Sequence, residues 1–226
     1  MKIAVLGGSF NPLHNGHIFL AEAVLKEFDY DKIFFVPTFI PPHKEIISGV
    51  SALQRFEMTK LFCETEKEHF IAEECEIKRG GLSYTFDTLQ YFLKKYKSET
   101  SKNKIEGKIG LIMGEEIAAE FNKWKNPFGI CEIADLIIAP RKCDYLKNHT
   151  EYAKNKPVKN YCGDFNKKFS KETFVFPFKM LNNPVTQISS TEIRRRILKN
   201  IDFKDLVPLV VYDYIKTNKL YLSENV

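Results

Sequence analysis

The chain has 226 residues, of which 44% are hydrophobic and 28% charged, with a formal net charge of +5 at pH 7. These values are ordinary for a globular protein and exclude a chain that is disordered throughout. The length suffices for one well-buried α/β domain, or for one domain with a small appendage. The positive charge is modest and spread along the chain, which does not fit the clustered basic surface of a nucleic-acid binder. We therefore predict no nucleic-acid partner.

The cysteines and the apolar runs favour a cytoplasmic protein. The five cysteines form no C-x-x-C pair and no Cys/His spacing typical of zinc, so we interpret them as reduced thiols and predict no dedicated metal site. No apolar stretch reaches the length of a membrane span, and the first apolar run is too short for a signal peptide. We predict no membrane partner, and the sequence leaves the oligomeric state open.

The string GGSFNPLHNGH, residues 7–17, is the first candidate site. An apolar run at 3–6 precedes it and predicts a buried strand, and the apolar residues of 18–25 follow at helical spacing. A strand, a glycine-rich turn and a helix point backbone N–H groups and a helix N-terminus at an anion. His14 and His17 are expected to lie near one another on the first helical turn.

Further strands and helices alternate along the rest of the chain. Because four of the predicted strands are nearly continuous apolar runs, we predict a doubly wound parallel sheet with helices on both faces. Strands are predicted at 3–6, 32–37, 70–77 (an edge strand), 108–114, 134–141 and 173–177; helices are predicted after a Ser51–Gln54 capping box, from 83 to about 97, at 115–124 and from about 188 to 197.

Three further segments carry polar residues suited to a ligand. In PPHK, two prolines after a strand present His43 and Lys44, although such a segment alone is more typical of a solvated loop. For Arg55, a surface position and a phosphate-binding role are equally favoured. In ISSTEIR, hydroxyls start a helix and Arg194 lies one turn in on the same face, which suits either an ordinary N-cap or a triphosphate clamp.

Taken together, these strings resemble the HxGH nucleotidyltransferase superfamily, whose GGSF(N/D)PxHxGH and ISS-T-x-I-R motifs match residues 7–17 and 188–194. PPHK, SYTFDTL at 83–89 and the F-x-x-W spacing at 121–124 are similar to segments of the bacterial nicotinate-nucleotide adenylyltransferases. The resemblance extends from Lys2 to about Tyr221.

The resemblance implies one Rossmann-like α/β domain over residues 1–226, with a polar loop or insertion at about 142–172 and a closing helical region at about 190–221. It also implies adenylyl transfer from ATP to nicotinate mononucleotide, giving deamido-NAD and pyrophosphate, in NAD biosynthesis. The attack would be direct and in line, and Mg²⁺ would be carried on the ATP phosphates rather than in a protein cage.

The same resemblance assigns site residues. His14, His17 and Arg194 are the implied catalytic residues. Glu116 stands where the family has Asp, so the nucleotide contact of that position is carried over to a longer side chain. The implied ATP-binding residues are Gly7, Gly8, Ser9, Phe10, His14, His17, Ser190, Thr191 and Arg194; those for the mononucleotide are Lys44, His43, Thr85 and Trp124; Glu116 and Arg55 are further candidates.

Three alternatives remain. The first is an adenylyltransferase of the same fold that acts on nicotinamide mononucleotide or phosphopantetheine; the SYTFDTL and F-x-x-W segments disfavour phosphopantetheine. The second is a non-catalytic nucleotide-binding module, which the intact His14, His17 and Arg194 disfavour. The third is a nucleic-acid-binding protein, which the lysines suggest but no aromatic-plus-basic motif supports.

Overall fold

The computed structural model describes residues 1–42, 49–66, 68–96, 104–140, 169–182 and 188–222. The predicted ligand-binding residues His43 and Lys44 lie outside these ranges, as does most of the predicted loop at about 142–172.

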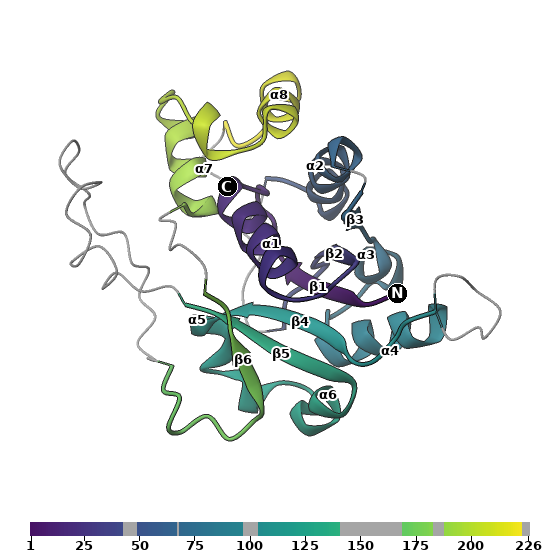
Figure 1. Ribbon diagram of the computed structural model, residues 1–226. Coiled ribbons are helices and arrows are strands. Elements are labelled where there is room, and N and C mark those ends of the chain that lie inside the picture. The colour runs from purple at the N-terminus through teal and green to yellow at the C-terminus, as the bar shows by residue number, and fades with distance from the viewer. Residues whose placement is uncertain (43–48, 67, 97–103, 141–168, 183–187, 223–226) are drawn as a thin grey trace.

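The described strands form a single six-stranded sheet in which every pairing is parallel (Figure 1). The strand order is β3-β2-β1-β4-β5-β6. This order confirms the predicted doubly wound sheet, with β1 and β4 side by side at its centre. The strands are β1 Ile3–Gly8, β2 Lys32–Pro37, β3 Phe70–Ala72, β4 Ile109–Gly114, β5 Ala134–Ala139 and β6 Phe178–Met180.

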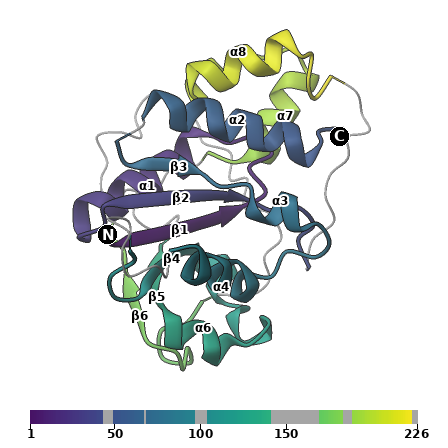
Figure 2. The same cartoon turned by 90° about the vertical axis from the view of Figure 1, so that its right-hand side faces the viewer.

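Helices cover both faces of the sheet (Figures 1 and 2). The helices α1, α2, α7 and α8 lie on one face, with α8 packed on the outer side of α2; α4, α5 and α6 lie on the other face. The bounds are α1 Asn15–Glu27, α2 Ala52–Thr65, α3 Cys75–Arg79, α4 Thr85–Lys95, α5 Glu115–Ala118, α6 Pro127–Ile133, α7 Ser190–Leu198 and α8 Leu209–Thr217, with 3-10 turns η1 Phe121–Lys123 and η3 Lys204–Leu206.

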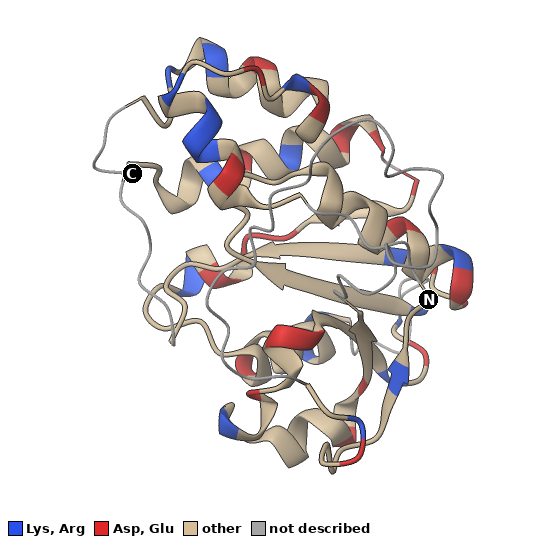
Figure 3. Ribbon diagram, turned by 90° about the vertical axis from the view of Figure 1, so that its left-hand side faces the viewer, with Lys and Arg blue, Asp and Glu red and all other residues tan. Residues whose placement is uncertain are grey.

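Alternate side chains of each central strand enter two separate cores. Leu6 and Ile112 face α1, α2, α7 and α8, whereas their neighbours Val5 and Leu111 face α4, α5 and α6. Burial on both faces is why these strands are continuous apolar runs. Charged residues accordingly lie mostly on the helices and turns around the strands (Figure 3).

Two predicted strands differ from the observed ones. The strand predicted at 70–77 pairs with β2 only over Phe70–Ala72, and the chain then forms α3, because the Glu76 carboxylate turns inward to accept a hydrogen bond from Thr88 Oγ1 at 2.6 Å. The strand predicted at 173–177 is replaced by β6 at Phe178–Met180. Pairing begins only after Pro177, which has no N–H to donate to a ladder.

The helix predicted at 115–124 is also shorter than expected. The α-helix ends at Ala118, and a 3-10 turn follows over Phe121–Lys123. This turn places the Phe121 ring in the core, completely buried, and leaves Trp124 just beyond it.

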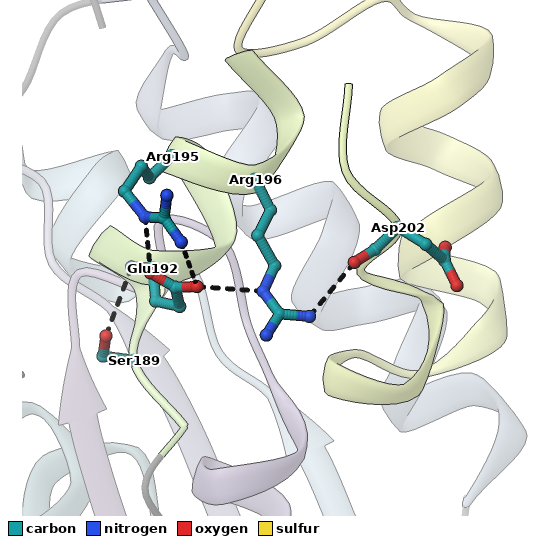
Figure 4. A network of polar contacts seen from close by, with 5 residues as sticks. All are labelled: Ser189, Glu192, Arg195, Arg196 and Asp202. Carbon is teal, nitrogen blue, oxygen red and sulfur yellow. Dashed lines mark hydrogen bonds and ion pairs between the residues drawn. The ribbon is translucent and has the colours of Figure 1, made fainter. Parts of the chain in front are cut away.

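Helix α7 is held by a charge network on its outer side (Figure 4). Its N-cap Ser189 accepts a hydrogen bond from the Glu192 amide at 3.2 Å. The Glu192 carboxylate accepts two hydrogen bonds from Arg195, both at 2.7 Å, and one from Arg196 Nε at 2.9 Å. The hydrogen bonds from Arg195, with the one from Arg196, lower the pKa of Glu192 to about 2.

This network predicts a pH-dependent contribution to stability. Since the pKa of Glu192 is lowered on folding, its contribution is complete above the unfolded value, about 4.3, and is lost as the pH falls toward about 2. Urea unfolding should find Glu192→Gln less stable than the wild type at neutral pH, with the difference shrinking from about pH 5 to about pH 3. A difference that stays constant over that range would contradict the assignment.

Candidate functional site

The loop after β1 is shaped by the ring of Phe10. Phe10 has a φ of 43° and is buried, and its ring stands edge-on against the imidazole of His17, with centroids 4.9 Å apart. A Cβ on Gly8 would stand 2.9 Å from Phe10 Cε1, whereas a Cβ on Gly7 would meet no atom within 4 Å. Gly8 is therefore required for the packing of Phe10, while the space beside Gly7 is open to a ligand.

His14 and His17 lie together at the start of α1, as predicted. His14 is the N-cap, and the two rings stack with centroids 3.7 Å apart. The His14 amide donates to His17 Nδ1 at 3.3 Å. Since Nδ1 accepts, the neutral His17 ring carries its proton on Nε2 and can donate it to an anion.

Helix α7 joins this loop from the other end of the chain. Ser190 Oγ donates to the Pro12 carbonyl at 3.0 Å, and Arg194 Nη1 donates to the Asn11 carbonyl at 2.7 Å. Arg194 is only 7% exposed, and its Nη2 contacts Thr191 Oγ1 at 3.4 Å. The two predicted ATP-binding motifs therefore form one structure around the Asn11–Pro12 turn.

Arg55 is a buried link between two loops. It is 1% exposed, so the predicted alternative of a surface arginine is wrong. Its Nη1 donates to the Ser9 carbonyl at 2.6 Å, and its Nη2 donates to the carbonyls of Thr38 at 2.7 Å and Phe39 at 3.3 Å. The guanidinium thus ties the loop after β1 to the loop after β2, and the phosphate-binding alternative stays a prediction.

The segment before α4 lies along the loop after β2. Ser83 Oγ accepts from the Phe39 amide at 3.0 Å, and the Ser83 amide donates to the Ile40 carbonyl at 2.8 Å. The N-cap is Tyr84, so neither Ser83 nor Thr85 caps the helix. Thr85, half-buried, is the first residue of α4 and stands where a helix N-terminus presents its amides.

The residues next to Trp124 and Thr85 contact one another. Lys125 donates to both carboxylate oxygens of Asp87, at 2.8 and 2.9 Å, and its ammonium lies 5.0 Å from the centroid of the Tyr84 ring. Trp124 itself is half-buried, with its ring centroid 5.2 Å from that of Phe121. The Lys125 contacts therefore link the start of α4 to the chain that follows η1.

Glu116 lies at the carboxyl end of β4. Its carboxylate folds back over Gly114, where a Cβ would stand 2.7 Å from Glu116 Oε2. Because β4 is the neighbour of β1, this carboxylate lies on the same edge of the sheet as the loop of Gly7 and Gly8. In open α/β sheets, ligands bind at this edge, where the strand order reverses.

The described part of the chain contains neither a cluster of metal ligands nor a membrane-spanning helix. No group of three or more His, Cys, Asp or Glu side chains is arranged there to hold a metal ion. None of its helices has the length and apolar character needed to cross a membrane.

Sequence reasoning missed the inward path of Arg55 and any role for Tyr221. Arg55 shares a helix face with Thr59 and Phe62, four and seven residues on, and all three are buried. That spacing was a usable signal for Arg55. Tyr221 is buried, and its hydroxyl donates to Asn11 Oδ1 at 2.7 Å. A contact across 210 residues gives no local signal.

Comparison with solved structures shows the same fold. A nicotinic acid mononucleotide adenylyltransferase of Plasmodium falciparum, complexed with NaAD, superposes with a TM-score of 0.65 over 97% of each chain, at 17% identity. A putative nicotinate-nucleotide adenylyltransferase of Vibrio parahaemolyticus superposes with a TM-score of 0.61 over 99% of this chain and 97% of that one, at 16% identity.

Sequence comparison shows the family. Residues 5–196 match the Cytidylyltransferase-like family. The chain is 36% identical to a probable nicotinate-nucleotide adenylyltransferase of Borreliella afzelii (strain PKo), over 99% of this chain and 98% of that protein. It is 35% identical to one of Treponema pallidum (strain Nichols), over 99% of this chain and 100% of that protein. The chain therefore belongs to the Cytidylyltransferase-like family and, within it, to the nicotinate-nucleotide adenylyltransferases.

Proposed function

We propose that the protein transfers the adenylyl group of ATP to nicotinate mononucleotide, releasing pyrophosphate and forming deamido-NAD. The observation that carries this proposal is the fastening of α7 to the loop of His14 and His17 through Ser190 and Arg194. This contact gathers imidazole, hydroxyl, guanidinium and helix N-terminal groups at the carboxyl end of β1. The full-length relatives at about 35% identity carry the name of the same activity.

The ATP half of the site consists of donors. Gly7 leaves open space beside the strand end, His17 Nε2 carries a proton, and α1 and α7 both begin here. These groups suit the oxygens of a triphosphate. We assign ATP binding to Gly7, Gly8, Ser9, Phe10, His14, His17, Ser190, Thr191 and Arg194, with Glu116 and Arg55 as further candidates beside them.

We assign the mononucleotide half of the site to Thr85 and Trp124. A tryptophan face stacks on a flat aromatic ring, and the amides at the start of α4 suit a carboxylate or a phosphate. From the sequence resemblance, Lys44 is assigned to the mononucleotide phosphate and His43 to mononucleotide binding, since both lie outside the described residues. Trp124 and the start of α4 thereby select the acceptor.

The reaction needs no protein nucleophile. An oxygen of the mononucleotide phosphate attacks the α-phosphorus of ATP, a new P–O bond forms, and the bond to the β-phosphate oxygen breaks. Pyrophosphate leaves with that electron pair. The protein then contributes by aligning the two substrates and by stabilising charge on the transferring oxygens, which we assign to His14, His17 and Arg194.

Mg²⁺ is proposed to enter with ATP. The groups assigned to the triphosphate are mainly N–H and O–H donors, whereas a dedicated Mg²⁺ site would need oxygen ligands. When bound to the phosphates, the ion neutralises their charge. Both substrates are proposed to bind from solution. We propose no nucleic-acid or membrane partner and a cytoplasmic location.

Substituting His17 tests the ATP half. His17→Ala should lower kcat by roughly 100-fold or more, because it removes a donor that acts in the transition state. His69→Ala is the matched control, because His69 is half-exposed and lies beside β3, away from the loop of Gly7 and Gly8. Steady-state pyrophosphate release measures both. Unchanged turnover in a folded His17→Ala protein would contradict the assigned role.

The choice of acceptor tests the proposed function itself. Pyrophosphate release is measured with ATP and Mg²⁺ and, in parallel, with nicotinate mononucleotide, nicotinamide mononucleotide or phosphopantetheine. We expect the highest kcat/KM with nicotinate mononucleotide.

Trp124→Ala should raise KM for nicotinate mononucleotide roughly tenfold, which is the scale of one lost stacking contact. Phe128→Ala, an exposed aromatic on α6, is the control.

Other outcomes identify the rivals. A higher kcat/KM with another acceptor would replace nicotinate mononucleotide as the substrate. Binding of ATP without pyrophosphate release would favour a non-catalytic module. An effect of Trp124→Ala confined to KM for ATP would contradict stacking on the acceptor ring.

A further inference from the structure

Tyr221 lies near the end of the chain but contacts the beginning of it. The turn after α8 directs both Leu220 and Tyr221 inward, and Tyr221 is 2% exposed. Its hydroxyl donates to Asn11 Oδ1 at 2.7 Å. The same Asn11 accepts a hydrogen bond at its carbonyl from Arg194. Asn11 is therefore held by two buried donors from the C-terminal part of the chain.

The backbone is unusual at Tyr221 and at the residue just before Asn11. Tyr221 has a φ of 63° and Phe10, which precedes Asn11, has a φ of 43°. Residues with large side chains rarely adopt this left-handed conformation, and they keep it only where the surroundings fix them. The contact between Tyr221 and Asn11 is therefore specified from both sides.

The hydroxyl lies within electrostatic range of two buried guanidinium groups, those of Arg55 and Arg194. Burial raises the pKa of Tyr221, so the phenol stays protonated and remains a donor at physiological pH. Arg55 holds the Ser9 carbonyl, and Arg194 holds the Asn11 carbonyl. Tyr221 thus adds a third buried contact to the same short loop.

We propose that Tyr221 is a positioning residue for adenylyl transfer, which holds Asn11 and through it the turn that carries His14 and His17. This inference rests on the proposed function. Asn11 stands three residues before His14, whose ring stacks on that of His17 at 3.7 Å. A shift of the turn would move both imidazoles relative to the phosphates of ATP. Misplacement by about 1 Å suffices to slow a reaction that depends on alignment.

The test removes only the hydroxyl. Tyr221→Phe keeps the ring in the core, and we expect kcat/KM for ATP to fall roughly tenfold, the scale of one lost hydrogen bond. KM for nicotinate mononucleotide should stay within about twofold of the wild type, because we assign that substrate to Thr85 and Trp124, which lie on other elements. Tyr212→Phe on α8 is the matched control, because the hydroxyl of Tyr212 makes no hydrogen bond within the described ranges.

A double substitution separates positioning from general stability. In an Asn11→Ala background, Tyr221→Phe should cause no further loss of kcat/KM for ATP, because its partner is already absent. Thermal unfolding of each variant confirms that it is folded. If Tyr221→Phe lowers the unfolding temperature but leaves kcat/KM unchanged, the residue is merely structural and the proposal is overturned. If Tyr221→Phe lowers kcat/KM for ATP by the same factor in the Asn11→Ala background as in the wild type, the proposal is also overturned.

The failure of the proposed function would be recognised separately. If the wild type releases no pyrophosphate with any acceptor, the proposed function fails. The positioning role is then decided by calorimetric titration with a non-hydrolysable ATP analogue and Mg²⁺. Weaker binding to Tyr221→Phe than to Tyr212→Phe supports the role, and equal binding overturns it.

Discussion

The Asn11–Pro12 turn is the constraint on which the rest of the site depends. Its two carbonyl oxygens accept hydrogen bonds from Ser190 and Arg194 of α7. A buried carbonyl left without a partner costs about 1–3 kcal/mol and a buried guanidinium costs more, so α7 cannot move away from the turn freely. The loop after β1 is therefore held in shape by contacts from the far end of the chain.

Much of the fold could be predicted because the central strands are buried on both faces and stand out as apolar runs. The errors occur where side chains leave that pattern. Glu76 turns inward to meet Thr88 and ends a strand early, and Pro177 delays the last strand because it has no N–H to donate. Neither effect is visible in hydrophobic periodicity, because each depends on a neighbour that is distant in sequence or on a single missing donor.

The site could be predicted in part from short sequence motifs. Motif strings placed His14, His17 and Arg194 on the correct elements, and the structure brings these elements together. Local patterns do not show where a long side chain goes, so Arg55 was not expected to bridge the loops after β1 and β2. The inward position of Tyr221 depends on a turn after α8 that packs against the core, which local patterns do not show.

We propose above all that residues 7–17 and 189–195, from opposite ends of the chain, bind one ATP molecule. Hydrogen–deuterium exchange of the wild type, with and without a non-hydrolysable ATP analogue and Mg²⁺, tests this directly. We predict slower exchange on binding in both segments, and none of comparable size in α6. Slower exchange confined to one of the two segments, or centred on α6, would contradict the claim.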